Sequence, residues 1–419
     1  MAHPDSKPRG LRLVRKVELP KGHKRLRLIL ALVFLVIGGL AIWWGLTAAL
    51  NQDPGWKTIE VDAKGVHCGE DFEFVYDLGR AGASATVELK ELTLIYSEAT
   101  KNAFEIFHES LDVEGVHNLA YLSAHPNEAV EIDPGLYKAL SLIVAQEDRN
   151  LFMGPVYELT SNLFQSENVG FAASCDPEKN PELGQTVAQI MTFAADPEHI
   201  SIQLLGGNQV RLCVSSAYLE LLRTEQISAL VDFGWMKNAF IIDYLVDAVT
   251  EKGYVHGYIA SFDGFTRNLD TRGLEFGFNL FDYNGDGLYL PAAMHYNKPI
   301  SIAYLRGYPL DDKDVGRYYR YANGDIVAPY VDPVDGKHKF AADNLVCYSY
   351  DLSCSQLLMQ MASVYTADTL DTDRLNELAE QKLYSVWFEG TEARYNEQGL
   401  KVQIKEDAGL DYTAAYAGK

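Results

Sequence analysis

The sequence predicts an α+β domain that follows one transmembrane helix. Residues 28–50 carry no charge, residues 83–108 repeat apolar side chains at helical spacing, and the later part of the chain holds several short runs typical of strands. These strand-like and helical segments do not alternate regularly. The pattern therefore favours an α+β domain over a regular series of βαβ units.

Charge is distributed unevenly along the 419 residues. The first 27 residues hold nine Lys or Arg and two acidic residues, whereas the chain after residue 50 is strongly acidic, and the net charge is −22. Protein binding to nucleic acid rests on neutralising phosphates with Lys and Arg. We therefore exclude nucleic acid and anionic lipid surfaces as partners of the acidic part.

The uncharged segment from Leu28 to Leu50 has the length of a membrane anchor. Its residues would span about 34 Å as a helix, and a hydrocarbon core is roughly 30 Å thick. The basic residues before it place the N-terminus in the cytoplasm, and Trp43 and Trp44 suit the outer interface. A cleaved signal peptide is the alternative, although its apolar core is usually shorter. The predicted parts are a basic cytoplasmic tail (1–27), a transmembrane helix (28–50), a juxtamembrane linker (51–65) and an extracytoplasmic domain (66–419).

The elements of the domain follow in chain order. A strand is expected at 72–78 and a long amphipathic helix at 83–108. Asp133 and Pro134 are suited to the cap and first turn of a helix at 136–145. Later helices are expected at 241–250 and 355–365. Strands are expected at 200–204, 209–214, 256–262, 275–282, 288–294, 300–305 and 344–350.

Cysteine and histidine patterns give little support to a metal site. The five Cys include no CxxC pair, so neither a disulfide framework nor zinc is indicated, and Cys347 and Cys354 either pair or stay free. The His residues show no HExxH or HxxxH spacing. The segment from Asp282 to Gly287 is similar to the start of a calcium loop. However, its twelfth position is Ala293 instead of Glu, which favours a hairpin turn.

Two denser groups of residues remain, and no Walker, GxGxxG or GxSxG motif is present. The first reads LVDFGWMKNAFIID from Leu230 to Asp243 and joins a strand end to a helix start. Such a helix start favours a phosphate, and Lys237 adds a positive charge. The second begins with GRYYRY at Gly316 and continues through two turns to residue 337. A capped helix and a hairpin explain these groups equally well.

Taken in order, these segments resemble the FAD:protein FMN transferases, or ApbE-type flavin transferases. The resemblance covers roughly residues 70–370. Residues 232–243 match the length of the family's D-L-G-G-I-A-K-G-Y-A-V-D, and residues 316–321 are similar to S-G-D-Y-E-R-Y. Residues 152–159 correspond to G-A-F-D-P-T. Residues 329–336 are similar to H-I-I-D-P-x-T-G, and residues 344–365 to the final strand and the A-D-A-L-x-T helix.

The resemblance implies a T-fold-like mixed sheet with flanking helices. Members of this family are extracytoplasmic and membrane-tethered, split FAD, and use Mg²⁺ to attach FMN through its phosphate to a Thr or Ser of a target protein. FAD, Mg²⁺ and a flavoprotein or other membrane protein are thus the implied cofactors and partner. The matching positions imply a flavin-binding set: Asp232, Gly234, Lys237, Asn238, Gly316, Tyr318, Arg320 and Asp332.

Departures from the family motifs concern catalysis. The metal Asp of the last helix falls on Ser355 and its Thr partner on Met359. Mg²⁺ demands oxygen ligands, so a thioether is a poor substitute. The flavin-contacting Lys falls on Asn238. The remaining departures are Trp235 for Gly, Pro329 for His, Asp335 for Thr, and Phe262 and Asp263 for the double Gly.

Three hypotheses follow. The lost metal ligands favour a non-catalytic relative that holds flavin or a partner protein, with Trp235, Phe262 and Met359 filling the old cleft. Alternatively, the chain is an active transferase whose metal ligands have moved, with Asp335, Asp263 or Glu128 as candidates. A third hypothesis is an acidic extracellular module for cations or peptides, which predicts weak calcium binding near Asp282 and no flavin affinity.

Overall fold

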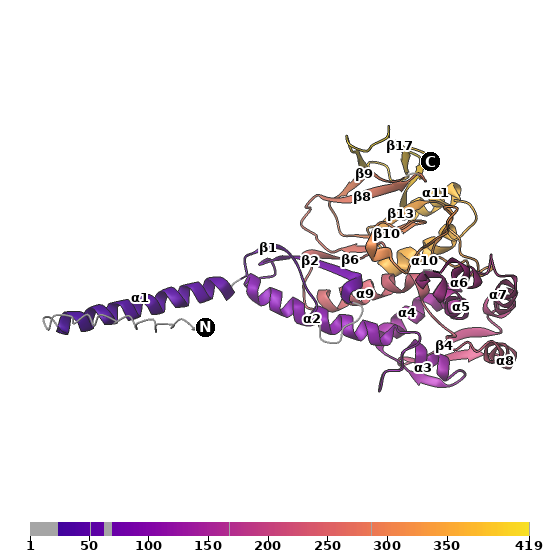
Figure 1. Ribbon diagram of the computed structural model, residues 1–419, viewed down its shortest axis with the longest axis horizontal. Helices are drawn as coiled ribbons and strands as arrows, with labels where there is room; N and C mark the ends of the chain where they lie inside the picture. The colour runs from indigo at the N-terminus through magenta and orange to yellow at the C-terminus, as the bar shows by residue number, and fades with distance from the viewer. Residues whose placement is uncertain (1–23, 51, 63–68, 167, 286, 419) are drawn as a thin grey trace, which may run out of the picture. The chain divides into compact units, whose positions relative to one another are not determined.

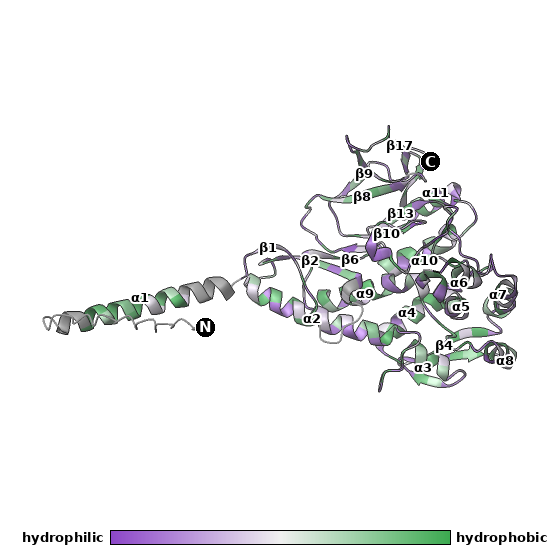
Figure 2. Cartoon of the chain, viewed as in Figure 1, coloured by the Kyte–Doolittle hydropathy of each residue, from purple (hydrophilic) through white to green (hydrophobic). Residues whose placement is uncertain are grey.

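The computed structural model describes residues 24–50, 52–62, 69–166, 168–285 and 287–418, and it divides into two units, Met1–Gln52 and Asp53–Lys419. In the first unit, α1 (Lys24–Leu50) is the described element. Its described side chains, at 28–43, are mostly apolar and exposed within this unit (Figure 2). Over the described part of the chain, no helix combines the length and the apolarity that a bilayer crossing demands.

The second unit contains ten α-helices among its described residues. They are α2 (Ala85–Ile106), α3 (Leu119–Ala124), α4 (Pro134–Ala145), α5 (Gly154–Gln165), α6 (Val169–Ser174), α7 (Pro181–Ala194), α8 (Ser216–Thr224), α9 (Lys237–Thr250), α10 (Cys354–Tyr365) and α11 (Thr372–Glu380). Figure 2 shows polar and apolar residues interleaved along α2, as expected for a helix with one buried face.

The strands of the second unit form a large sheet and three small ones. They are β1 (Gly55–Thr58), β2 (Phe72–Leu78), β3 (Ala129–Glu131), β4 (Ile200–Gly206), β5 (Gln209–Val214), β6 (Gly257–Ser261), β7 (Phe265–Asn268), β8 (Phe276–Tyr283), β9 (Leu288–Tyr296), β10 (Ile300–Arg306), β11 (Tyr319–Arg320), β12 (Ile326–Val327), β13 (Asn344–Ser349), β14 (Tyr384–Glu389), β15 (Glu392–Tyr395), β16 (Lys401–Ile404) and β17 (Thr413–Tyr416).

The large sheet has the strand order β1-β2-β6-β7-β10-β13-β14-β15-β17 within the described residues. All of its neighbouring strands are antiparallel except β15 and β17, which are parallel. The sheet is therefore mixed, and the unit has the predicted α+β character.

Each face of the large sheet has its own cover (Figure 1). Helices α2, α9 and α10 pack on one face, where Phe74, Ile259 and Leu305 belong to the main core. The three-stranded sheet β16-β9-β8 packs on the other face, where Ile302 and Tyr304 belong to a second core. Successive residues of β10 thus enter different cores, as strand alternation requires. The sheet β3-β5-β4 lies to one side, in contact with α3 and α4 (Figure 1).

Several predicted elements occur at the expected positions. Strand β2 spans the predicted residues, and α4 begins at Pro134 with the Asp133 side chain accepting from the Gly135 backbone N–H. The long helix starts at Ala85, because Ser84 caps it. The segment expected as a linker contains β1, which pairs with the outer edge of β2.

The hairpin interpretation of the Asp282 segment is confirmed. Strands β8 and β9 pair antiparallel across it, and position 286 lies outside the described residues. The Asp282 carboxylate turns inward and accepts hydrogen bonds from Tyr412 Oη (2.8 Å) and Asn344 Nδ2 (3.2 Å). Cys347 and Cys354 are both buried and free.

Candidate functional site

A cleft of about 370 Å³ opens on the helix-covered side of the large sheet. Its volume lies in the range of about 300–1,000 Å³ that is usual for small-molecule sites. The walls come from α5, the start of α9, the turn between β6 and β7, and the segments before β11 and after β12. Its lining includes Asp71, Tyr157, Asp232, Gly234, Trp235, Lys237, Asn238, Asp263, Gly316, Arg317, Tyr318 and Tyr330.

Six of the eight residues predicted to bind flavin line this cleft: Asp232, Gly234, Lys237, Asn238, Gly316 and Tyr318. The other two lie outside its lining. The Arg320 guanidinium lies 5.3 Å from the ring centroid of Tyr283. The carboxylate of Asp332 instead accepts the Val334 backbone N–H at 2.9 Å and Lys339 Nζ at 3.0 Å.

The backbone at the start of α9 explains why Asp and Gly occur there. Asp232 Oδ1 accepts the Gly234 backbone N–H at 2.8 Å, at the entrance to a short 3₁₀ turn (Gly234–Met236) that leads into the helix. Gly234 has a φ of +52°, and a Cβ there would lie 2.3 Å from ring atoms of Tyr157. Only glycine satisfies both the backbone angle and this close approach.

Lys237 holds a partly buried positive charge between two carboxylates. Its Nζ lies 2.5 Å from Glu109 Oε2 and 3.9 Å from Asp232 Oδ1. Burial pushes the pKa of Lys237 down, but these two carboxylates raise it above its ordinary value. Burial raises the pKa of Asp232 although the ammonium opposes it. Lys237 is therefore charged, and it shares its charge with Asp232, which lines the cleft, and with Glu109, which lies outside the cleft lining.

Two polar atoms of the cleft wall are buried and unpaired. Within the described residues, Tyr157 Oη and Trp235 Nε1 have no hydrogen-bond partner. Trp235 packs edge-on against Tyr330, with ring centroids 5.1 Å apart. Buried polar groups normally have partners, so these two donors are candidates for contact with a bound molecule.

The positions that match the family's metal ligands are occupied by the fold itself. Ser355 and Met359 are 5% and 8% exposed, and neither lines the cleft. The Asp243 carboxylate accepts hydrogen bonds from the Ser355 backbone N–H (2.9 Å), the Cys354 backbone N–H (3.0 Å) and Ser353 Oγ (2.7 Å). Asp243 therefore caps the start of α10. No cluster of three or more His, Cys, Asp or Glu suited to a metal occurs in the described part of the chain.

The three carboxylates considered as relocated metal ligands do not converge. Asp263 lines the cleft, where its Oδ2 accepts Asn238 Nδ2 at 2.9 Å. Asp335 lies outside the cleft lining and pairs with Lys339 Nζ at 2.9 Å. Glu128 also lies outside the cleft lining.

The expectation that Trp235, Phe262 and Met359 fill the cleft is wrong for two of them. Trp235 borders the cleft. Phe262 lies by the opposite face of the sheet, next to a different cavity, because the turn after β6 directs it there. Met359 belongs to the main core.

Sequence reasoning missed the contribution of α5. Tyr157, Thr160, Ser161, Phe164 and Gln165 from this helix line the cleft. Their spacing of three and four residues places them on one helix face. This spacing is a signal in the sequence that the match to the family motif at 152–159 does not contain. Asp71 and Arg317 were also missed, and they form an ion pair at 3.3 Å.

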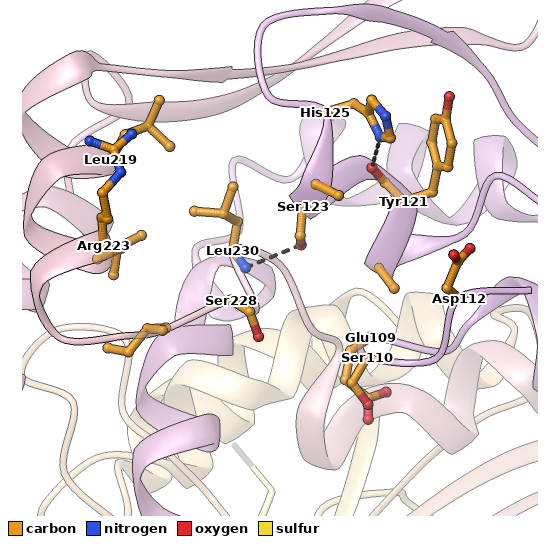
Figure 3. A pocket seen from close by; sticks show the side chains of 14 residues that line it. Glu109, Ser110, Asp112, Tyr121, Ser123, His125, Leu219, Arg223, Ser228 and Leu230 are labelled. Atoms are coloured by element: carbon orange, nitrogen blue, oxygen red, sulfur yellow. Dashed lines mark hydrogen bonds between the residues drawn. The ribbon is translucent and has the colours of Figure 1, made fainter.

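A second cavity of about 560 Å³ lies between α3, α8 and the loop before α9 (Figure 3). Glu109 and Asp112 lie on one side of it and Arg223 on the other. No predicted flavin-binding residue lines this cavity. The Lys237–Glu109 ion pair connects its wall to that of the cleft.

Comparison with known proteins adds evidence on the fold. No family model and no curated protein matches the sequence. The crystal structure of the ApbE protein from Thermotoga maritima matches with a TM-score of 0.54 and 11% identity, over 80% of this chain and 93% of that one. The flavin transferase ApbE from Vibrio cholerae matches with a TM-score of 0.50 and 12% identity, over 85% and 99%. The chain therefore has an ApbE-like fold.

Proposed function

We propose that this chain is a membrane-anchored, extracytoplasmic protein that binds a flavin nucleotide in the cleft and has little or no transferase activity. The similar structure from Vibrio cholerae is that of a flavin transferase, which supports a flavin ligand. The proposed loss of activity rests on one observation: Ser355 and Met359 are buried away from the cleft. At these two positions α10 therefore presents no oxygen ligand to a metal there.

The residues of the cleft fit a flavin nucleotide. Tyr157 Oη and Trp235 Nε1 are donors without partners in the described residues, and a flavin ring offers carbonyl and ring-nitrogen acceptors. Lys237 and Arg317 are the cations of the cleft wall, and a phosphate would compete for them with the carboxylates that now pair with them, Glu109 and Asp71. FAD, when bound, would supply the group that a transferase passes on as FMN. The chain's own residues would bind and orient it.

A divalent metal fits less well. Phosphoryl transfer depends on a cation to neutralise charge on phosphate oxygens. The carboxylates of the cleft are already engaged: Asp71 with Arg317, Asp232 with the Gly234 backbone, and Asp263 with Asn238. We therefore derive no step through Mg²⁺.

The alternative is an active, Mg²⁺-dependent transferase that attaches FMN to a Thr or Ser of a membrane redox protein. One observation favours it, because Asp71, Asp232 and Asp263 all line the same cleft. Mg²⁺ prefers carboxylate oxygens, and a bound ion could draw these groups away from their present partners. This alternative predicts that FAD binding and AMP release both depend on Mg²⁺.

Membrane anchoring rests on the sequence. Residues 28–50 carry no charge and follow nine basic residues, which supports an anchor with a cytoplasmic N-terminus. The exposed apolar side chains of α1 at 28–43 also support it, because such a surface is unfavourable in water. Fractionation and protease accessibility of the full chain in cells test this part of the proposal.

The decisive experiment is a titration of FAD into the full chain in detergent, with and without Mg²⁺. The proposal expects quenching of flavin fluorescence that Mg²⁺ does not change, together with no release of AMP. Tighter binding with Mg²⁺ and AMP release would establish the alternative instead. No flavin binding under either condition would refute both.

Variants locate the binding site. Asp263→Ala and Lys237→Met alter the cleft and should change FAD affinity. Asp335→Ala is the matched control, because this carboxylate lies outside the cleft and its partner Lys339 keeps Asp332 and Asp368 as counter-ions. Equal effects of Asp263→Ala and Asp335→Ala would show that flavin does not bind in the cleft.

A further inference from the structure

A separate cavity of about 580 Å³ lies by the other face of the large sheet. Strand β10 separates this cavity from the cleft, because Leu305 lines the cleft whereas its neighbours Tyr304 and Arg306 line the cavity on the other face. We call it the sandwich cavity, since it lies between the large sheet and the sheet β16-β9-β8. The proposed flavin site does not extend into it.

Small side chains leave this space unfilled. Glu73, Ala260, Thr266 and Ile302 are register partners on β2, β6, β7 and β10, so they lie in one row across the same face of the sheet. Ile302 belongs to the second core, which fills the β10 side of the sandwich. Ala260 and Thr266 are too small to reach the opposing sheet, and the sandwich is hollow above them.

Aromatic side chains form most of the remaining wall. Phe276 of β8 stacks with Tyr296 of β9, with ring centroids 5.7 Å apart and an interplanar angle of 17°. Phe278 of β8 meets Tyr304 of β10 edge-on at 6.1 Å. Other aromatic residues of the wall are Tyr258, Phe262 and Phe281. Ring surfaces of this kind favour a flat apolar partner.

The charges of the sandwich cavity disfavour an anion. Glu73 and Asp311 line it. Arg306 is the cation among its lining residues, and the ion pair to Asp314 at 2.6 Å neutralises it, with both side chains 2% exposed or less. Close by, Lys313 Nζ lies over the ring of Phe262. Phosphates and carboxylates would meet two acidic groups here and no unpaired cation in the wall.

We propose that the sandwich cavity binds an uncharged aromatic ring compound. The cavity is partly open to solvent, and contact of the aromatic part of its wall with water is unfavourable. A flat neutral ligand would fill the space between Ala260 of the large sheet and the aromatic side chains of β8. The one cation among the described residues of this wall, Arg306, is buried in its ion pair with Asp314 and so is not available to a phosphate, which means that the two sites would bind different ligands.

A matched pair of fluorescent probes tests this proposal with the full chain in detergent. N-phenyl-naphthylamine is uncharged, and anilinonaphthalene sulfonate has a similar ring system with one negative charge. Ala260→Phe fills the cavity and serves as the blank for partitioning of each probe into micelles. We expect the wild-type chain to bind the uncharged probe at least about tenfold more tightly than Ala260→Phe does, because the added ring occupies its site.

Charge and size are then separated by two further variants. Ala260→Ser keeps the space and should keep binding of the uncharged probe. Glu73→Gln should strengthen binding of the sulfonate by about threefold to tenfold through loss of repulsion, and leave the uncharged probe unchanged. FAD affinity should be the same in all of these variants, because the cleft lies across the sheet.

Two outcomes would overturn the proposal. Equal binding of the uncharged probe by the wild-type chain and Ala260→Phe would show that the cavity is not its site. Equal binding of both probes by the wild-type chain would remove the preference for an uncharged ligand. If Ala260→Phe fails to fold, Thr266→Leu fills the same row from the neighbouring strand and gives the same comparison.

Discussion

Replacing Asp243 by alanine should destabilise the protein by about 3 kcal/mol. The carboxylate accepts two backbone N–H groups, of Cys354 and Ser355, and two serine hydroxyls at the start of α10. Loss of a cap costs about 0.5–2 kcal/mol. Each buried donor left without a partner costs about 1–3 kcal/mol. The hydroxyls can turn toward other acceptors, which keeps the total below the sum of these ranges.

Urea unfolding of the full chain in detergent measures this loss, with the fluorescence of buried Trp387 as one reporter. Ser355→Ala removes one donor but leaves both backbone bonds to Asp243, so it should cost about 1 kcal/mol. Asp247→Ala is the control one turn further along α9. Its pair with Lys138 is exposed, so the change should stay within about 0.5 kcal/mol.

A small effect of Asp243→Ala, below about 1 kcal/mol, would refute the capping role. The same titration distinguishes a cap from a metal ligand. Mg²⁺ should leave the unfolding midpoint of the wild-type chain unchanged. A midpoint that rises with Mg²⁺, and no longer does so in Asp243→Ala, would show that this carboxylate binds metal.

Three further predictions concern stability. Burial lowers the pKa of His338 from 6.5 to about 4, so its contribution to stability is complete above pH 6.5 and is lost as the pH falls toward 4. His338→Asn should flatten the decline in the free energy of unfolding over this interval by up to about 3 kcal/mol. Gly234→Ala should destabilise the protein by about 1–3 kcal/mol and weaken FAD binding, because the added Cβ would clash with the ring of Tyr157. If the variant keeps the FAD affinity of the wild-type chain, the close packing of this turn is not needed for binding. Asp314→Ala should cost about 3–5 kcal/mol in urea unfolding, because Arg306 would be left buried without its counter-ion; a change below about 1 kcal/mol would show that water reaches it.

The sequence predicted those elements whose local signals agree with their packing. Buried and partly buried side chains alternate along most of β2, as expected for a strand with a different layer packed on each face of its sheet. Helix α4 has both Asp133 as its cap and Pro134 in its first turn. Strand β1 escaped prediction because it is short and mostly exposed, and its pairing with β2 stabilises it. Such a strand depends on a partner distant in sequence, which periodicity does not reveal.

The candidate site was predictable where the motif itself forms the cleft wall. Asp232, Gly234 and Lys237 lie at one turn, so the motif match groups three residues that all line one cleft in the structure. Arg320 and Asp332 lie outside the lining of this cleft, and a matching residue type does not show the direction of its side chain. The match to the family motif ends at residue 159 and so covers only the first part of α5. The contribution of α5 to the cleft wall depends on how the helix packs against the rest of the domain.

The acidic residues that match the family motifs each have a structural task that is independent of catalysis. Asp232 holds the turn before α9, Asp243 caps α10, and Asp332 fixes a turn and pairs with Lys339. A protein that lost transferase activity would still need all three, so their presence does not argue for an enzyme. The unpaired donors of Tyr157 and Trp235 are different, because no described residue accepts from them. If Tyr157→Phe leaves stability unchanged and weakens FAD binding, the hydroxyl serves a ligand; if FAD affinity is also unchanged, the cleft binds its ligand without it.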